Sequence, residues 1–214
     1  MSKPNLIVVA GCNGSGKSTF SKTYVKDLIP FDFDKKFMQK YDALHDSELR
    51  DVIARNLIRV EFETAIYEAF SRNESFCYET NFDANPIHWV EQAKKLGYHI
   101  ELHFYCLDSL EMAKQRVFYR THNNGHFVPD DTVEYKWKEG YKNLNLYFRM
   151  FDHILLIDNS SETQPVQNIC TLTKKNDSTY DVHLFNEIPH YAKRRFPEIY
   201  KILKKIKPQS DIFD

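Results

Sequence analysis

The sequence is poor in glycine, and its few cysteines show no metal-binding pattern. Among 214 residues there are only 6 glycines, and three of them fall between residues 11 and 16. This composition excludes the glycine-rich fibrous and low-complexity classes. The 4 cysteines are widely spaced and form no C-x-x-C pair. That spacing excludes the common zinc-binding patterns and favours free thiols in a reducing compartment.

An excess of charge and long apolar runs are also missing. The formal net charge is -1, so the chain as a whole has no bulk electrostatic attraction to nucleic acid or to a membrane surface. No stretch approaches the roughly 18 apolar residues that a membrane span needs. The apolar run at residues 6–10 is too short for a signal peptide. We therefore expect a cytoplasmic protein without membrane contact, and nucleic acid is disfavoured as a partner.

Apolar, strand-like segments alternate with segments of helical period. The strand-like segments lie at residues 6–10, 31–34, 75–78, 98–107 and 154–157. The longest helical segment, residues 47–71, carries apolar side chains at helical spacing, including Leu49, Val52, Ile53, Leu57, Val60 and Ile66. The alternation predicts an α/β fold with a mainly parallel, five-stranded sheet and right-handed crossovers.

The last quarter of the chain has a different character. Residues 166–173 and 180–184 flank a polar segment, which predicts an antiparallel hairpin. Residues 188–206 then read as a terminal helix that breaks near Pro197. We divide the chain into a core at residues 1–160, with a lid at about 116–140, and a C-terminal appendage at residues 161–214.

Residues 11–18 read Gly-Cys-Asn-Gly-Ser-Gly-Lys-Ser and match the phosphate-binding pattern G-x-x-x-x-G-K-S/T at every fixed position. The motif follows a buried strand and precedes a helix, which is the context it requires. Its glycines let backbone N–H groups wrap around an anion. Lys17 would reach the outer phosphates and the Ser18 hydroxyl would bind Mg²⁺. The nucleotide-binding residues expected from the motif are Gly11, Asn13, Gly14, Ser15, Gly16, Lys17, Ser18 and Thr19.

The rest of the sequence narrows the kind of P-loop protein. We find neither the guanine-reading N-K-x-D of GTPases nor the L-S-G-G of transporter ATPases. The predicted fold is therefore the P-loop NTPase or kinase three-layer sandwich, and the small size favours a small-molecule kinase that uses ATP or GTP with Mg²⁺. Such an enzyme needs a group that activates the acceptor hydroxyl and cations that neutralise the transferring phosphoryl group.

Candidates for these roles follow the predicted strands. Asp34 lies just past the second one and is our candidate acceptor-activating carboxylate, with Asp32 as the weaker choice. Glu79, Thr80 and Asn81 end the third strand, and carboxyl ends of parallel strands are where ligands bind in such sheets. They are our candidates for contacts to the substrate or to a magnesium-bound water.

Arginines in the predicted lid are the candidate cations. Arg116 and Arg120 are four residues apart, hence on one face of a helix. The planar fork of an arginine matches phosphate oxygens. His126 lies at the lid turn and is a candidate substrate contact, and Lys136 and Lys138 on the following helix are weaker cationic candidates.

With these residues assembled, the chain resembles the zeta-toxin-like family of P-loop kinases over roughly residues 5–160. The resemblance rests on the order of the P-loop and the segments 31–34, 76–81, 104–108, Arg116-Val117 with Arg120, 125–129 and 158–160. It implies an ATP- or GTP-dependent kinase that phosphorylates the sugar of UDP-N-acetylglucosamine, and an antitoxin as protein partner. It also implies that Lys17 binds phosphate, that Asp34 activates the acceptor, and that the substrate side is lined by Glu79, Thr80, Asn81 and, on the preceding helix, Glu63.

Residues 134–138 depart from the family pattern, because many members carry an arginine-rich segment where this chain has Glu134, Lys136 and Lys138. A lysine supplies charge but no bidentate fork. This departure keeps an alternative open, a nucleotide-binding regulatory protein with vestigial kinase activity. A third interpretation is a kinase that acts on a nucleic-acid end, against which the neutral overall charge argues.

Overall fold

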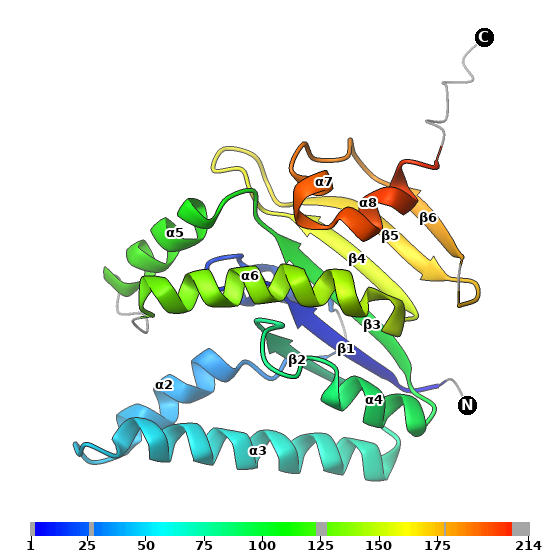
Figure 1. Ribbon diagram of the computed structural model, residues 1–214. Helices are drawn as coiled ribbons and strands as arrows, with labels where there is room; N and C mark the ends of the chain where they lie inside the picture. Colours follow the sequence, from blue (N-terminus) through cyan, green and yellow to red (C-terminus); the bar gives the residue numbers. More distant parts are fainter. Residues whose placement is uncertain (1–2, 26–27, 123–127, 178, 207–214) are drawn as a thin grey trace.

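A six-stranded sheet forms the centre of the molecule in this computed structural model, which describes residues 3–25, 28–122, 128–177 and 179–206. The strand order is β2-β1-β3-β4-β5-β6 (Figure 1). The strands are β1 (Asn5–Ala10), β2 (Phe76–Thr80), β3 (His99–Cys106), β4 (His153–Asp158), β5 (Gln167–Lys174) and β6 (Tyr180–Leu184). The first four run parallel, and β5 and β6 are added antiparallel at the β4 edge.

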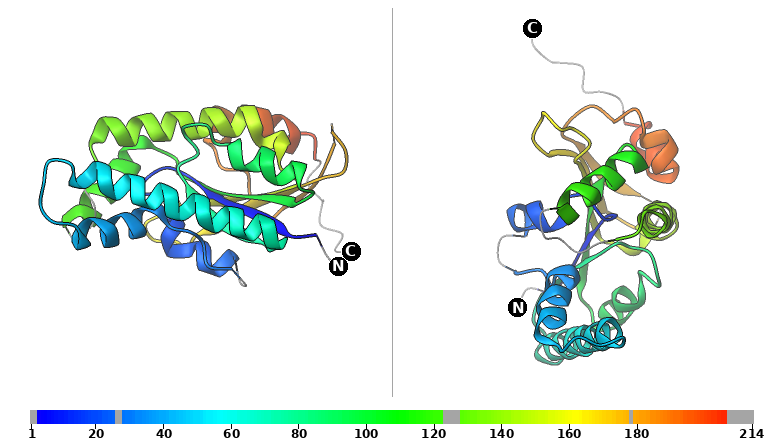
Figure 2. Two further views of the ribbon diagram at one scale, coloured as in Figure 1. Left: turned by 90° about the horizontal axis from the view of Figure 1, so that it is seen from below. Right: turned by 90° about the vertical axis from the view of Figure 1, so that its left-hand side faces the viewer.

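Helices cover both faces of the sheet, which confirms the predicted α/β sandwich. On one face α1 (Lys17–Tyr24) packs against the odd-numbered β1 residues Ile7 and Val9. On the other face lie the buried sides of α3 (Arg50–Arg72), α4 (His88–Lys95), α5 (Leu110–His122) and α6 (Asp130–Tyr147), which together bury Leu6 and Val8 (Figure 2). Burial on both faces explains why β1 is continuously apolar.

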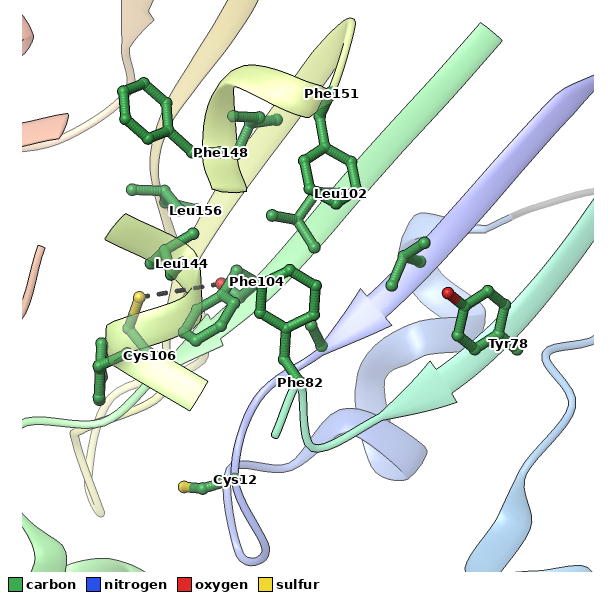
Figure 3. Close-up of a cluster of buried hydrophobic side chains, with 14 of the residues drawn as sticks. Cys12, Tyr78, Phe82, Leu102, Phe104, Cys106, Leu144, Phe148, Phe151 and Leu156 are labelled. Atoms are coloured by element: carbon green, nitrogen blue, oxygen red, sulfur yellow. Dashed lines mark hydrogen bonds between the residues drawn. The ribbon is translucent and has the colours of Figure 1, made fainter. Parts of the chain in front are cut away.

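The larger core is built from aromatic and branched side chains contributed by segments far apart in the sequence. Phe104 of β3, Leu156 of β4 and Leu144 of α6 meet there, and Phe148 of the short helix η1 (Phe148–Met150) joins them (Figure 3). These side chains are at most 2% exposed. Burying one such side chain contributes roughly 1.5–3 kcal/mol, so this cluster holds the strands whose ends carry the polar residues described below.

The prediction of a second strand at residues 31–34 is wrong. Only Phe31 pairs with the sheet, through a single parallel bridge to Tyr78. Asp32 instead caps α2 (Phe33–Ala43), because its Oδ1 accepts a hydrogen bond from the Lys35 backbone N–H at 3.0 Å. A side-chain cap of this kind favours helix initiation. Asp34 therefore lies in the first turn of a helix.

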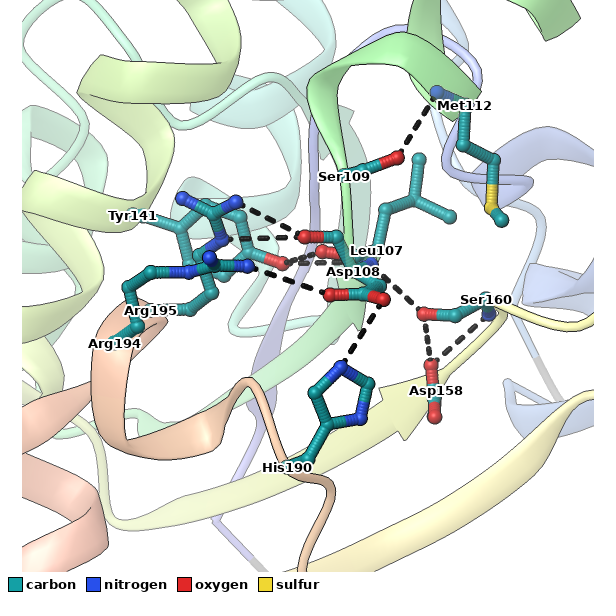
Figure 4. Close-up of polar contacts among 10 residues, drawn as sticks. All are labelled: Leu107, Asp108, Ser109, Met112, Tyr141, Asp158, Ser160, His190, Arg194 and Arg195. Carbon is teal, nitrogen blue, oxygen red and sulfur yellow. Dashed lines mark hydrogen bonds and ion pairs between the residues drawn. The ribbon is translucent and has the colours of Figure 1, made fainter.

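The predicted hairpin and the broken terminal helix are confirmed, and the hairpin continues the main sheet. Figure 4 shows how the terminal segment, α7 (Ala192–Arg195) and α8 (Pro197–Leu203), is attached at the end of β3. The Arg195 guanidinium donates to the Asp108 carbonyl oxygen at 3.0 and 3.3 Å and stacks 3.9 Å from the Trp137 ring centroid. None of the helices in the described ranges is both long and apolar enough to cross a membrane.

Candidate active site

The loop between β1 and α1 has the conformation that its glycines allow. Gly14 and Gly16 have φ angles of 79° and 90°, in the left-handed region that costs other residues strain. A Cβ atom on Gly16 would lie 2.4 Å from Asn159 Nδ2. Asn159 donates from the same Nδ2 to the Ser15 carbonyl oxygen at 2.9 Å. The turn after β4 therefore buttresses the loop, a contact that the sequence motif alone does not reveal.

Lys17 and Ser18 stand at the start of α1 and face the end of β2. Lys17 Nζ donates to the carbonyl oxygens of Gly11 and Cys12 at 2.6 and 3.0 Å, and Asn81 Oδ1 lies 3.5 Å away. The Ser18 hydroxyl donates to Glu79 Oε2 at 2.6 Å. Predicted residues from two separate motifs are thus brought together.

Glu79 is a nearly buried carboxylate. Its side chain also accepts a hydrogen bond from Ser21 Oγ at 3.0 Å, and the residue is 6% exposed. Burial raises its pKa above the ordinary 4.5, against the lowering effects of the Ser18 hydrogen bond and the Lys17 charge. A partly desolvated carboxylate beside a P-loop hydroxyl is a group that a bound cation would stabilise in its charged form.

The donor atoms at this point fit magnesium. Mg²⁺ prefers hard oxygen ligands and usually takes only one or two from the protein, with phosphates and waters completing the shell. Ser18 Oγ and the Glu79 carboxylate meet that requirement. Within the described ranges no group of three or more His, Cys, Asp or Glu side chains could hold a metal ion by itself, so any cation here would share its shell with the nucleotide.

A cavity of about 910 Å³ lies beside the P-loop and extends to Asp34 and Arg120. The predicted residues that line it are Asn13, Gly14, Gly16, Lys17, Ser18, Thr19, Asp32, Asp34, Glu79, Thr80, Asn81, Arg116, Arg120 and Lys136. Asp34 and Arg120 form an ion pair across it, with 3.4 Å between Oδ2 and Nη1. Asp34 is about half exposed, so its carboxylate is accessible from the cavity.

The two predicted lid arginines are not equivalent. Arg116 donates to the carbonyl oxygens of Asn159 and Ser161 at 2.7 and 3.3 Å. It is therefore tied to the turn after β4 that supports the P-loop. Arg120, one helical turn further along α5, reaches across the cavity to Asp34. Arg116 thus stabilises the turn next to the P-loop, and Arg120 contacts Asp34, the candidate base.

The sequence did not predict a role for residues 82–86, which follow Asn81 and form one wall of the cavity. Phe82 has a φ of 61°, which is unusual for a bulky side chain. Its ring is fully buried against Phe104 and Phe151. Asn143 Nδ2 donates to the carbonyl oxygens of Phe82 and Asp83 at 2.9 and 2.6 Å. The strained turn is thereby held in place, and Asp83, Asn85, Pro86 and Trp89 join the lining.

Some predicted residues lie elsewhere. Gly11 and Ser15 shape the P-loop without lining the cavity, and Glu63 on α3 does not reach it. His126 lies outside the described residues. Lys136, a weaker candidate from the sequence, lines the cavity and is partly buried, and this burial lowers its pKa below 10.5. Lys138 lies on the exposed side of α6, paired with Glu134 at 2.6 Å.

The sequence model of the zeta toxin family matches residues 1–168. An uncharacterized protein of Haemophilus influenzae is 26% identical over 132 residues, which are 61% of this chain and 91% of that protein.

Three solved structures are similar in fold. The PezAT toxin-antitoxin system of Streptococcus pneumoniae gives a TM-score of 0.53 at 15% identity, over 96% of this chain and 88% of the other. The AvrRxo1-ORF1:-ORF2 structure with ATP gives 0.60 at 14% identity, over 99% and 66%. A chain of the Pnkp1/Rnl/Hen1 RNA repair complex gives 0.51 at 17% identity, over 71% and 47%, so our chain spans about half of that relative. At these identities the likeness concerns the fold alone.

The family match begins before the P-loop and ends inside β5, so it includes every residue that lines the cavity. Of the segments that carried the resemblance in the sequence, the P-loop, residues 31–34, residues 76–81, Arg116, Arg120 and Asn159 contribute to the lining of this cavity. Most of the chain is covered by the match, and the chain belongs to the zeta toxin family.

Proposed function

We propose that this protein is a P-loop kinase that transfers the terminal phosphoryl group of ATP to a hydroxyl group of a small molecule. The observation that carries the proposal is the shared cavity, where Lys17 and Ser18 face Asp34 and Arg120. The family membership supports a kinase. The structure of a similar fold with ATP supports ATP as the co-substrate.

The donor side of this reaction belongs to the P-loop. Its backbone N–H groups and the start of α1 would hold the nucleotide phosphates, with Lys17 on the outer ones. Ser18 and Glu79 are the residues that would hold Mg²⁺, and the ion would neutralise phosphate charge when bound.

The acceptor side centres on Asp34. As the acceptor oxygen bonds to the terminal phosphorus and the bond from that phosphorus to the departing ADP oxygen breaks, Asp34 would take the proton of the hydroxyl group. Arg120, 3.4 Å from Asp34, would keep the carboxylate oriented and stabilise the charge of the transferring phosphoryl group. General-base catalysis of this kind contributes typically about 10²- to 10⁴-fold.

The cavity wall around Asp34 suits a polar ring with an anionic group. Trp89 and Phe33 supply apolar surface, Asp83 and Asn85 can accept or donate to hydroxyls, and Lys136 offers a positive charge. UDP-N-acetylglucosamine, the acceptor implied by the family resemblance, combines these features and is our first candidate. An antitoxin protein as partner is part of the same proposal, since PezAT is a toxin-antitoxin pair.

Phosphate transfer from labelled ATP tests the proposal. Wild type is incubated with UDP-N-acetylglucosamine and a panel of other hydroxyl acceptors, beside Asp34→Asn and the control Asp42→Asn, an exposed carboxylate on the same helix. We expect labelled acceptor from wild type and control, and about 10²- to 10⁴-fold less from Asp34→Asn, with ATP binding unchanged. ATP binding without label on any acceptor would favour the regulatory alternative. Equal transfer by Asp34→Asn would remove Asp34 from the role of base.

A further inference from the structure

Two residues of the segment after β2 hold their backbone in the left-handed region. Phe82 has a φ of 61° and Asn85 a φ of 44°, a conformation that is uncommon for residues other than glycine. Strained backbone persists only where neighbouring groups hold it, and it is concentrated at active sites and ligand-binding positions. The same segment forms one wall of the cavity. Whatever holds this turn therefore also fixes the shape of the cavity.

One side of helix α6 holds this turn. Asn143, which is 6% exposed, donates from Nδ2 to the carbonyl oxygens of Phe82 and Asp83 at 2.9 and 2.6 Å. Gly140 lies three residues before Asn143 and hence on the same side of the helix. A Cβ atom on Gly140 would lie 2.9 Å from the carbonyl oxygen of Asn81, closer than packed atoms approach. Three consecutive carbonyl groups of the turn thus rest against α6, and only glycine at position 140 allows this approach.

The anchored segment carries side chains to two parts of the cavity. Asn81 Oδ1 lies 3.5 Å from Lys17 Nζ, on the phosphate side. Asp83 also lines the cavity, near enough to Lys136 for its charge to raise the pKa of that lysine against the lowering effect of burial. A misplacement of about 1 Å in a group that orients a substrate can cost about 100-fold in rate. The hydrogen bonds from Asn143 therefore bear on catalysis, although Asn143 itself does not line the cavity.

We propose that Asn143 is a positioning residue: with the space left by Gly140, it fixes the turn at residues 81–83 and thereby the place of the acceptor beside Asp34. The role of the turn in acceptor binding rests on the proposed kinase function, whereas the anchoring is a feature of the fold alone. The P-loop is held by a separate contact, from Asn159. The acceptor, and not ATP, is therefore the substrate whose binding depends on Asn143.

Asn145 on the same helix is a matched control for Asn143. Its Nδ2 also donates to two backbone carbonyl oxygens, those of Tyr141 and Arg195 at 2.8 and 2.9 Å. These bonds connect α6 to α7 and do not reach the turn after β2. Alanine at either position removes hydrogen bonds of the same kind, so a difference between the two variants reports where the bonds lead.

Steady-state phosphate transfer to UDP-N-acetylglucosamine, or to the acceptor of the panel that wild type labels, tests the role in the reaction. We expect Asn143→Ala and Gly140→Ala to lower kcat/KM for the acceptor by about 10- to 100-fold and to leave the Kd for ATP unchanged. Asn145→Ala should melt at a lower temperature than wild type but keep both constants. Alanine is a better helix former than glycine, so a loss of transfer by Gly140→Ala does not come from a weakened helix. Wild-type kinetics in Asn143→Ala and Gly140→Ala, or equal losses in all three variants, would overturn the proposal.

Hydrogen–deuterium exchange of residues 81–89 tests the anchor without any turnover, and so separates this inference from the kinase proposal. In Asn143→Ala we expect the amides of this segment to exchange about 3- to 10-fold faster than in wild type, because the turn opens more often. In Asn145→Ala they should exchange at the wild-type rate. A wild type that labels no acceptor but shows this pattern would refute the kinase proposal and confirm that Asn143 holds the cavity wall. Equal exchange in Asn143→Ala and wild type would overturn the anchor, whatever the transfer assay shows.

Discussion

At the scale of single residues, Glu79 illustrates a conflict between stability and function. Its carboxylate is held in a nearly buried position beside Ser18, and burial raises its pKa above 4.5. Between 4.5 and the raised pKa the folded chain binds more protons than the unfolded chain. The stability of the fold therefore falls as the pH rises through this window.

The substitution Glu79→Gln separates the two effects. Glutamine can still accept from the Ser18 hydroxyl but carries no charge, so we expect the melting temperature of the nucleotide-free variant to exceed that of wild type at neutral pH. The difference should shrink as the pH falls below the raised pKa. Activity should drop about 10- to 100-fold, as for lost partners of a metal site. Thermal melts at several pH values check this, and identical pH profiles for the two proteins would contradict it.

Lys136 supplies a second prediction at this scale. It lines the cavity, and its burial lowers its pKa. Loss of a charge-assisted hydrogen bond costs about 1.5–3 kcal/mol. If the acceptor is anionic, Lys136→Gln should therefore lower kcat/KM for the acceptor by about 10- to 100-fold and leave the KM for ATP nearly unchanged. Lys138→Gln, on the exposed side of the same helix, is the control and should match wild type in steady-state assays.

The sequence predicted the residues of this cavity only where they belong to a pattern. The P-loop was recognisable because its spacing is fixed by the shape of a phosphate group. Glu79 and Asn81 were recognisable because they follow an apolar strand. Asp83 and Trp89 could not be predicted, since their place depends on the left-handed turn at Phe82 and on its anchor Asn143, which lies about sixty residues away.

At the scale of elements, the periodicity of apolar residues did not reveal which side of a helix is buried. The spacing predicted a helix over residues 47–71, and α3 confirms it, yet the inner and outer sides are both apolar. The segment at residues 31–34 alternates like a strand. In the structure, however, the Asp32 side chain accepts a hydrogen bond from the Lys35 backbone N–H, and this cap stabilises the start of helix α2 at Phe33. Short alternating segments are ambiguous because a single cap can outweigh them.

The attachment of α7 gives the prediction that belongs to this scale. Arg195 makes two hydrogen bonds to the Asp108 carbonyl oxygen and stacks on Trp137. Arg194 makes only one exposed ion pair to Asp108 at 3.6 Å. We expect Arg195→Ala to lower the free energy of unfolding by about 2 kcal/mol, and Arg194→Ala by less than about 0.5 kcal/mol. Urea denaturation of both variants measures the difference, and equal losses would contradict this account of the attachment.

At the scale of the whole molecule, the strand order follows from the connections. The parallel strands β1 to β4 are separated by helical segments, as parallel neighbours require. The hairpin follows β4 after a short loop and pairs with it antiparallel. The sequence predicted the hairpin itself, but it did not predict that the hairpin extends the main sheet at the β4 edge. Which edge a hairpin joins depends on burial, and Ile169, Cys170 and Leu172 of β5 are fully buried against the core.

This burial makes the C-terminal quarter necessary for folding. A chain shortened after Gln164 would lose the pairing along β4 and the buried side chains Ile169, Leu172, Tyr191, Phe196, Ile199 and Leu203. At roughly 1.5–3 kcal/mol each, their loss is comparable to the entire stability of a domain, about 5–15 kcal/mol. We expect the shortened chain to show no cooperative thermal transition and to bind no ATP, whereas a chain ending at Ile206 keeps every described element and should melt like the full chain. A cooperative melt of the shortened chain within a few degrees of wild type would show instead that residues 1–164 form an independent domain. The hairpin would then contribute little to the stability of the fold.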